Sequence, residues 1–196
     1  MPATIPDAQA VLDFWFGAPG APEHGQLRAE WFRKDSGFDA VIAQRFGARV
    51  EAALAGGLAD WAPSADAALA RILVLDQFTR NMFRDTAGAF SGDALALAGA
   101  RAMVAAGQDT TLRPEQRVFV YLPFEHSESL ALQEQSVGLY QALAAQAPAF
   151  ANYLDYARRH HAVVARFGRF PHRNELLGRA STAEEQAFLK EPGSRF

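Results

Sequence analysis

The chain has 196 residues, 49% of them hydrophobic and 21% charged, so one domain with a sizeable core is expected over residues 1–196. The net charge of −3 gives no reason to expect nucleic acid as a partner, because nucleic-acid-binding domains usually carry a basic excess. There is no cysteine, which excludes a disulfide framework, a thiolate metal site and a thiol nucleophile. The chain's start lacks the pattern of a signal peptide, and no apolar run approaches the roughly 20 residues of a membrane span, so we expect a cytoplasmic protein.

The first half of the chain shows apolar residues at helical spacing, divided by glycine, proline and capping residues. Thr4 can cap a first helix that ends at Gly17, and a short helix follows around Trp31. Residues 36–39, Ser-Gly-Phe-Asp, resemble a capping box for a third helix. Ser64 can cap a fourth helix, and the buried stripe of that helix starts at Leu69, Ile72 and Leu73.

The second half continues in the same way. The predicted helix starts are Ser91, Pro114, Ser127, Pro148 and the capping box Ser181-Thr-Ala-Glu184. Pro123 is expected to end or kink the helix that begins at Pro114. No stretch shows the sustained alternation of a strand. We therefore predict an all-α fold of about nine helices joined by short loops.

A first polar cluster lies in the fourth helix. Asp76 follows Ile72 by four positions, so it continues the apolar stripe, and Arg80 follows Asp76 by another four. Burying ions costs several kcal/mol unless they are paired or used for a function. We predict a structural ion pair between Asp76 and Arg80, with a ligand-binding role for Arg80 or Asn81 as the alternative.

A second cluster, Glu125, His126 and Glu128, lies at a helix junction after Pro123. A histidine beside carboxylates can act as a general acid or base, so we predict these three as catalytic residues. The alternative is structural, with Glu128 in a first helical turn and Ser127 as a cap. A metal bound by His126, these carboxylates, and His160 or His172 is conceivable, but the His-Glu-x-x-His spacing is missing and we predict no metal.

The third cluster is residues 166–174, Arg-Phe-Gly-Arg-Phe-Pro-His-Arg-Asn, which we call the basic loop. Gly168 and Pro171 argue against a continuous helix here. The predicted ligand-binding residues, which could clamp a carboxylate or phosphate, are Arg166, Arg169, His172, Arg173 and Asn174, with His160 facing inward from the preceding helix. The alternative is that these arginines bind helix C-terminal carbonyls and neighbouring carboxylates.

These clusters and both ends of the chain resemble the family called bacterial domain of unknown function 924. The matching stretches, which cover nearly the whole chain, are Val11–Gly17, Leu75–Arg84, Tyr121–Glu128, Arg166–Asn174 and Pro192–Phe196. Thr79 stands where the family usually has proline, which bears on the end of the fourth helix. The resemblance implies a tetratricopeptide-like right-handed superhelix, and it implies no activity.

Two functions follow as hypotheses. In the first, the three helix ends converge on a pocket for a small anionic metabolite, with a hydrolase-type reaction through His and Glu acid–base chemistry. In the second, a tetratricopeptide-like groove binds a peptide. RNA binding through the C-terminal arginines is disfavoured by the negative net charge of the chain. Nothing in the sequence predicts a cofactor, and substrate and oligomeric state are left open.

Overall fold

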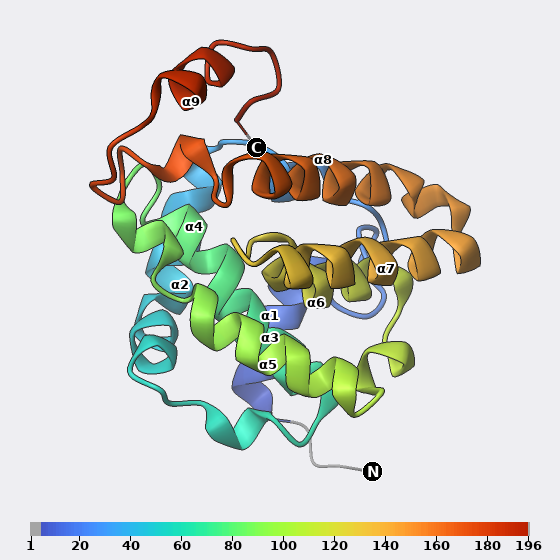
Figure 1. Cartoon of the computed structure of the whole chain (residues 1–196). Coiled ribbons are helices and arrows are strands. Elements are labelled where there is room, and N and C mark those ends of the chain that lie inside the picture. Colours follow the sequence, from blue (N-terminus) through green and yellow to red (C-terminus); the bar gives the residue numbers. More distant parts are fainter. Residues whose placement is uncertain (1–4, 196) are drawn as a thin grey trace. The chain divides into compact units, whose positions relative to one another are not determined.

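The computed structural model describes residues 5–195, and this part of the chain contains helices and no strand (Figure 1). Its α-helices are α1 (Pro6–Phe16), α2 (Ser36–Leu54), α3 (Ala65–Leu73), α4 (Thr79–Met82), α5 (Asp93–Ala105), α6 (Pro114–Glu125), α7 (Leu130–Gln146), α8 (Ala151–Phe167) and α9 (Ala183–Phe188). Short 3-10 helices are η1 (Ala29–Phe32), η2 (Ala59–Trp61), η4 (Ala87–Phe90), η5 (Gln108–Thr111), η6 (Pro148–Phe150) and η7 (Pro171–Arg173).

The all-α prediction is confirmed. Between α3 and α4 the chain forms a π-helical segment, η3 (Val74–Phe78), without a break, so the nine α-helical segments of the described residues make eight separate helices. The right-handed superhelix and the peptide groove stay predictions. None of the helices in residues 5–195 combines the length and the hydrophobicity that a membrane span needs.

Several helix starts are shifted by one or two residues from the predicted caps. Ser64 does cap α3, since its side chain accepts from the Ala67 N–H. The cap of α2, however, is Asp35, whose carboxylate accepts from the N–H groups of Gly37 and Phe38 at 2.9 and 3.0 Å. Acceptors at adjacent positions compete for the same N–H groups, and the Asp35 carboxylate is the stronger acceptor.

The same correction applies to the later helices. The N-cap of α5 is Gly92, and the Ser91 hydroxyl donates instead to the Gly88 carbonyl. The N-cap of α7 is Ser129, and the Ser129 N–H donates to the Ser127 hydroxyl oxygen. The capping box of α9 joins Thr182 to Glu185, one residue later than predicted. Thr4, the predicted cap of α1, lies outside the described residues.

The π-helical segment holds the first polar cluster. Asp76 and Gln77 are buried here, and the Thr79 hydroxyl donates to the Leu75 carbonyl at 2.8 Å. Threonine has an N–H, so the helix continues as α4 where proline would have removed a donor. The extra residue in the π-turn rotates the following side chains relative to an α-helix.

The described chain divides into two compact units. Unit 1 comprises residues 1–84 and 88–123, and unit 2 comprises residues 85–87 and 124–196. The core of unit 1 is aromatic: Trp31 and Phe119 lie 5.0 Å apart, and Phe46 and Phe78 also lie 5.0 Å apart, ring centre to ring centre. The prediction of a single domain over residues 1–196 stays a prediction.

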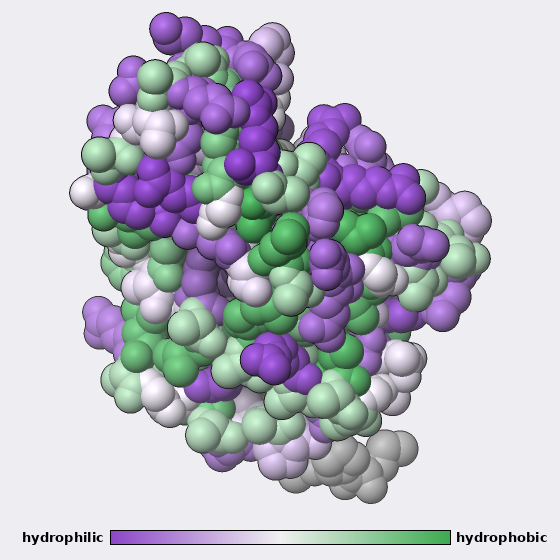
Figure 2. Space-filling view, in the orientation of Figure 1, coloured by the Kyte–Doolittle hydropathy of each residue, from purple (hydrophilic) through white to green (hydrophobic). Residues whose placement is uncertain are grey.

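Unit 2 is built on α7 and α8, which pack side by side as an antiparallel pair (Figure 1). Tyr140 of α7 stacks on Tyr153 of α8 at 6.4 Å. Near the end of α8 a second buried group forms from Val163, Val164 and Phe170. Figure 2 shows mostly hydrophilic residues over the segment that carries α9, at the upper left. The basic loop begins in the last turn of α8 and precedes this segment in the chain.

Candidate functional site

The basic loop has the broken conformation that its glycine and proline predict. Gly168 ends α8 in the left-handed region, with φ of 69°, and its N–H donates to the Val164 carbonyl at 2.8 Å. A glycine adopts this conformation without the steric penalty that a Cβ would add. Pro171 then starts η7, and Phe170, between them, is fully buried.

Two arginines of the loop bind carboxylates of α9. The Arg169 guanidinium donates to Glu185 Oε1 and Oε2 at 2.6 and 2.8 Å, and to the Ala180 carbonyl at 2.9 Å. These hydrogen bonds raise the pKa of Arg169. Arg166 donates to Glu184 at 2.9 Å. Both guanidinium groups are therefore paired within unit 2, and their predicted role in binding a ligand stays a prediction.

Glu128 receives three hydrogen bonds from the segment that follows α8. Arg179 donates to its two oxygens at 2.7 and 2.9 Å, and the Phe170 N–H donates at 2.8 Å. Burial disfavours the carboxylate, but the bonds from Arg179 and Phe170 outweigh burial and hold the pKa of Glu128 below its usual range. This geometry anchors the loop, and the catalytic role of Glu128 stays a prediction.

Phe170 is the centre of a cluster of basic side chains. The Arg173 guanidinium lies 4.5 Å from the Phe170 ring centre, and the rings of His160 and His172 lie 5.5 and 5.6 Å from it. Arg173 also donates to the His126 carbonyl at 3.0 Å. We call His126, His160, His172 and Arg173 the histidine cluster, since it holds three of the five histidines of the chain.

Within this cluster Glu125 pairs with His160. Glu125 Oε1 lies 3.2 Å from His160 Nδ1, and both residues are buried. His160 Nδ1 also lies 2.9 Å from the Tyr156 carbonyl. Because both neighbours are acceptors, Nδ1 carries the hydrogen of the neutral imidazole and Nε2 carries the lone pair. The sequence had suggested His126, the neighbour along the chain, as the partner of Glu125.

Burial, helped by nearby positive charges, keeps two of these histidines neutral. Burial lowers the pKa of His160 to about 3, against the effect of the Tyr156 carbonyl, and His126, Arg173 and His172 lower it further. Burial, then Arg173, Arg195 and His126, lower the pKa of His172 to about 4. The positive charge of Arg173 acts strongly on both imidazoles because these groups are close together and partly shielded from water.

Two further polar residues of α7 are fully buried in unit 2, and our sequence reasoning missed both. Gln133 donates through Nε2 to the carbonyls of Glu125 and Ser127 at 2.5 and 2.6 Å. Its Oε1, and the hydroxyl of Ser136, are buried without a hydrogen-bond partner in the described part of the chain. Gln133, Ser136 and Tyr140 share one face of α7, so the spacing argument that identified Asp76 would have found them.

The first polar cluster belongs to unit 1. Arg80 lies 3.1 Å from Asp76 and donates to both oxygens of Asp93 at 2.8 and 3.1 Å. Asn81 donates to Asp39 at 2.7 Å, and Arg84 donates to the same carboxylate. Burial opposes the charge of Arg80, but Asp76 and Asp93 outweigh it and raise the pKa of Arg80. These contacts tie α4 to α2 and α5.

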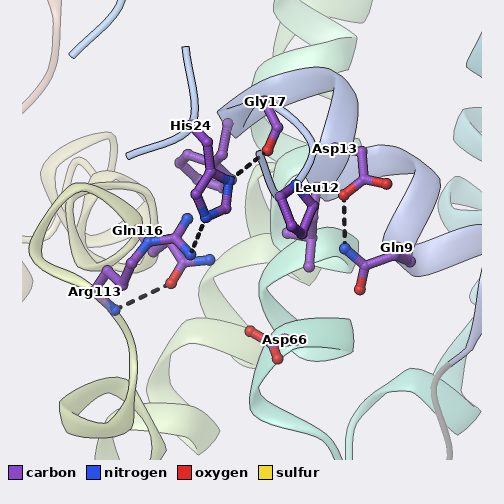
Figure 3. Close-up of a pocket in the computed structure, with 10 residues that line it drawn as sticks. Gln9, Leu12, Asp13, Gly17, His24, Asp66, Arg113 and Gln116 are labelled. Atoms are coloured by element: carbon purple, nitrogen blue, oxygen red, sulfur yellow. Dashed lines mark hydrogen bonds between the residues drawn. The ribbon is translucent and has the colours of Figure 1, made fainter. Parts of the chain in front are cut away.

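Unit 1 also contains a cavity of about 150 Å³ that no sequence pattern had indicated (Figure 3). It lies between α1, the loop that follows α1, and the starts of α3 and α6. Its polar lining residues are Gln9, Asp13, His24, Asp66, Arg113 and Gln116. They come from three separate stretches of the sequence and follow no known motif, so only the packing of unit 1 reveals them. In the described part of the chain, no three His, Asp or Glu side chains are grouped to hold a metal ion.

Comparisons with known proteins agree with the fold. A family model described as "Bacterial protein of unknown function (DUF924)" matches residues 11–193. The solved structure of the protein of unknown function ATU0120 from Agrobacterium tumefaciens is similar to this chain with a TM-score of 0.81 and 39% sequence identity. The similarity covers 93% of this chain and 96% of that one. No curated protein matches.

Proposed function

Because the chain belongs to the bacterial protein family of unknown function DUF924, which supplies no activity, we propose a function from the chemistry of unit 2. In this proposal unit 2 binds a small anionic metabolite, a phosphate or a carboxylate, at the histidine cluster. The Glu125–His160 pair then transfers a proton to or from the bound molecule or from a water molecule, as in a hydrolase-type reaction.

One observation carries the proposal: the rings of His160 and His172 and the Arg173 guanidinium gather around Phe170, and both histidines stay neutral partly because Arg173 and His126 are close to them. An anion at this place would offset the effect of Arg173 and favour the protonated imidazoles. Phosphate and carboxylate oxygens accept hydrogen bonds from imidazolium and guanidinium groups, and such charged bonds are stronger than neutral ones.

The Glu125–His160 pair gives the proposed proton transfer a structural basis. A carboxylate that accepts from one ring nitrogen orients the imidazole, and the other nitrogen is then the base. With a pKa of about 3, His160 is a weak base at neutral pH. A bound anion would raise this pKa towards neutrality. In our proposal the histidine therefore becomes an efficient base only when the anionic substrate is present.

The other predicted residues take supporting roles in the proposal. Asn174 donates to Ser181 and Glu185 and, with Arg166 and Arg169, holds the basic loop to α9. Glu128 holds the loop through Arg179 and Phe170. Arg80 and Asn81 bind carboxylates of unit 1, and we do not include them among the proposed binding residues.

We expect inorganic phosphate, added at constant ionic strength, to raise the melting temperature of the protein. A ligand that binds only the native state adds about 2.7 kcal/mol of stability at a hundredfold excess over Kd. The stabilisation should grow as the pH falls from about 7 towards 5, because an anion binds the protonated histidines more tightly. It should be largely lost in His172→Asn, which keeps a similar shape but removes the imidazole.

His161→Asn is the matched control, since His161 is the neighbour of His160 in α8 but is not part of the cluster. Phosphate should stabilise this variant as it stabilises the original protein. Equal stabilisation of both variants, or no pH dependence, would contradict the proposed site. Acetate and succinate in the same assay distinguish a carboxylate ligand from a phosphate ligand.

A further inference from the structure

Residues 125–128, which we call the junction segment, connect the end of α6 to the cap of α7 and carry two groups of the histidine cluster. The Glu125 carboxylate lies 3.2 Å from His160 Nδ1. The His126 carbonyl accepts from Arg173 at 3.0 Å. Both contacts start from the same short piece of backbone, so the position of this backbone decides whether the carboxylate reaches the imidazole.

The backbone of the junction segment is held by a side chain of α7. Carbonyl groups at a helix end and just after it have no partner within the helix, so they need a donor from elsewhere. Gln133 supplies it, since its Nε2 donates to the carbonyls of Glu125 and Ser127 at 2.5 and 2.6 Å. An amide nitrogen carries two hydrogens, so one side chain can hold both carbonyls. Gln133 is fully buried, and water therefore does not compete for these bonds.

The amide of Gln133 lowers the stability of the fold in one respect. Its Oε1 is buried without a hydrogen-bond partner in the described part of the chain, and an unsatisfied buried acceptor is destabilising. A lysine could donate to both carbonyls without this loss, but its charge would compete with His160 for the Glu125 carboxylate. The neutral amide holds the backbone of Glu125 and leaves the carboxylate to the histidine. A glutamine therefore fits the needs of the Glu125–His160 pair better than it fits stability alone.

We propose that Gln133 is a positioning residue for the Glu125–His160 pair. It fixes the carbonyls of the residues on either side of His126, and in this way it holds the Glu125 carboxylate beside His160 Nδ1. The oriented imidazole then presents Nε2, which carries the lone pair, for the proton transfer. This inference rests on the proposed function for the purpose of the pair, but the hydrogen bond between Glu125 and His160 can be measured without any ligand.

The experiment follows the Nδ1 proton of His160 in ¹H–¹⁵N NMR spectra of the full chain, labelled at its histidines and free of phosphate. A proton that is bonded to a carboxylate resonates at lower field than one bonded to a neutral carbonyl, because the charged hydrogen bond is stronger. Gln133→Met keeps the length of the side chain and removes both donors. We expect the proton to move to higher field, since the Tyr156 carbonyl is a neutral acceptor and the carboxylate is no longer held in place. An unchanged signal would overturn the proposal.

A double substitution separates positioning from a merely structural role. Glu125→Gln removes the carboxylate itself and should move the His160 proton in the same direction. If Gln133 acts through Glu125, adding Gln133→Met to Glu125→Gln should cause almost no further shift, because the two changes remove one interaction. A further shift as large as that of Gln133→Met alone would mean that Gln133 acts on the histidine by another route, and it would also overturn the proposal.

Gln135→Met is the matched control, since Gln135 lies in the same helix with an exposed side chain, and it should leave the signal of His160 unchanged. If Gln133→Met does not fold, Gln133→Asn takes its place, because it keeps the amide but is too short to hold both carbonyls, and the same direction of shift is expected. The melting temperature of the original protein with phosphate tests the anion site separately. A shift in Gln133→Met without stabilisation by phosphate would therefore contradict the proposed function and leave the positioning role in place.

Discussion

Replacing Gly92 by alanine is expected to destabilise the protein by about 3 kcal/mol or more, or to prevent folding. A Cβ at this position would lie 2.0 Å from the Leu75 carbonyl oxygen and 2.8 Å from the Leu75 carbonyl carbon. Both are backbone atoms of the π-helical segment, so they cannot rotate away as the end of a side chain could. The start of α5 would have to move, which would also separate Asp93 from Arg80.

The measurement is thermal or urea unfolding of Gly92→Ala beside Gly99→Ala. Gly99 lies in the same helix, and a Cβ there would meet Ile72 at 3.6 Å, an ordinary contact. Alanine in the interior of a helix is favoured over glycine by roughly 0.5–1 kcal/mol, so Gly99→Ala should be neutral or slightly stabilising. Similar stabilities of the two variants would show that α5 and the π-helical segment are not as close as the structure has them.

Arg169→Ala is expected to lower the melting temperature clearly, because it leaves the Glu185 carboxylate buried without its cation. The Glu185 side chain is only 3% exposed, and it also accepts from the Thr182 N–H at 2.7 Å and from Asn174. The effect should appear as faster hydrogen exchange in α9. Such a loss would mark Arg169 as a structural residue, whereas an unchanged melting temperature would favour the ligand-binding role predicted from sequence.

Arg166→Ala is the matched control. The Arg166–Glu184 pair also joins the basic loop to α9, but its side chains are 48% and 63% exposed. Exposed pairs contribute about 0–1 kcal/mol, so this variant should lose much less stability than Arg169→Ala. Comparable losses of stability in the two variants would mean that the burial of Glu185 does not determine how much its ion pair contributes to stability.

The Arg169–Glu185 pair predicts that the stability of the protein depends on pH. The hydrogen bonds from Arg169, followed by those from Thr182 and Asn174, outweigh burial and lower the pKa of Glu185 to about 2. A carboxyl with a lowered native pKa stabilises the fold above its unfolded pKa, here about 4.5. This stabilisation is lost as the pH falls from about 4.5 towards 2. Glu185→Gln should therefore show a flatter stability profile than the original protein in this window.

The sequence by itself determined the helical content, the approximate helix positions and the break at the basic loop. Apolar spacing in α1 and α8 and the conformational properties of Gly168 and Pro171 are local, so they act in the same way in any fold. Cap positions were displaced by one residue at Asp35 and Thr182, because several neighbouring side chains can accept from the same N–H groups.

Only the tertiary structure decided which charged groups meet. The sequence shows that Glu125 precedes His126, but packing of unit 2 puts Glu125 against His160, and it pairs Arg169 with Glu185 and Arg179 with Glu128. Such pairings depend on helix rotation and on distances between residues far apart in the chain, which no local pattern encodes. The cavity of unit 1 arises in the same way, since α1, α3 and α6 line it only after the aromatic core has set their positions.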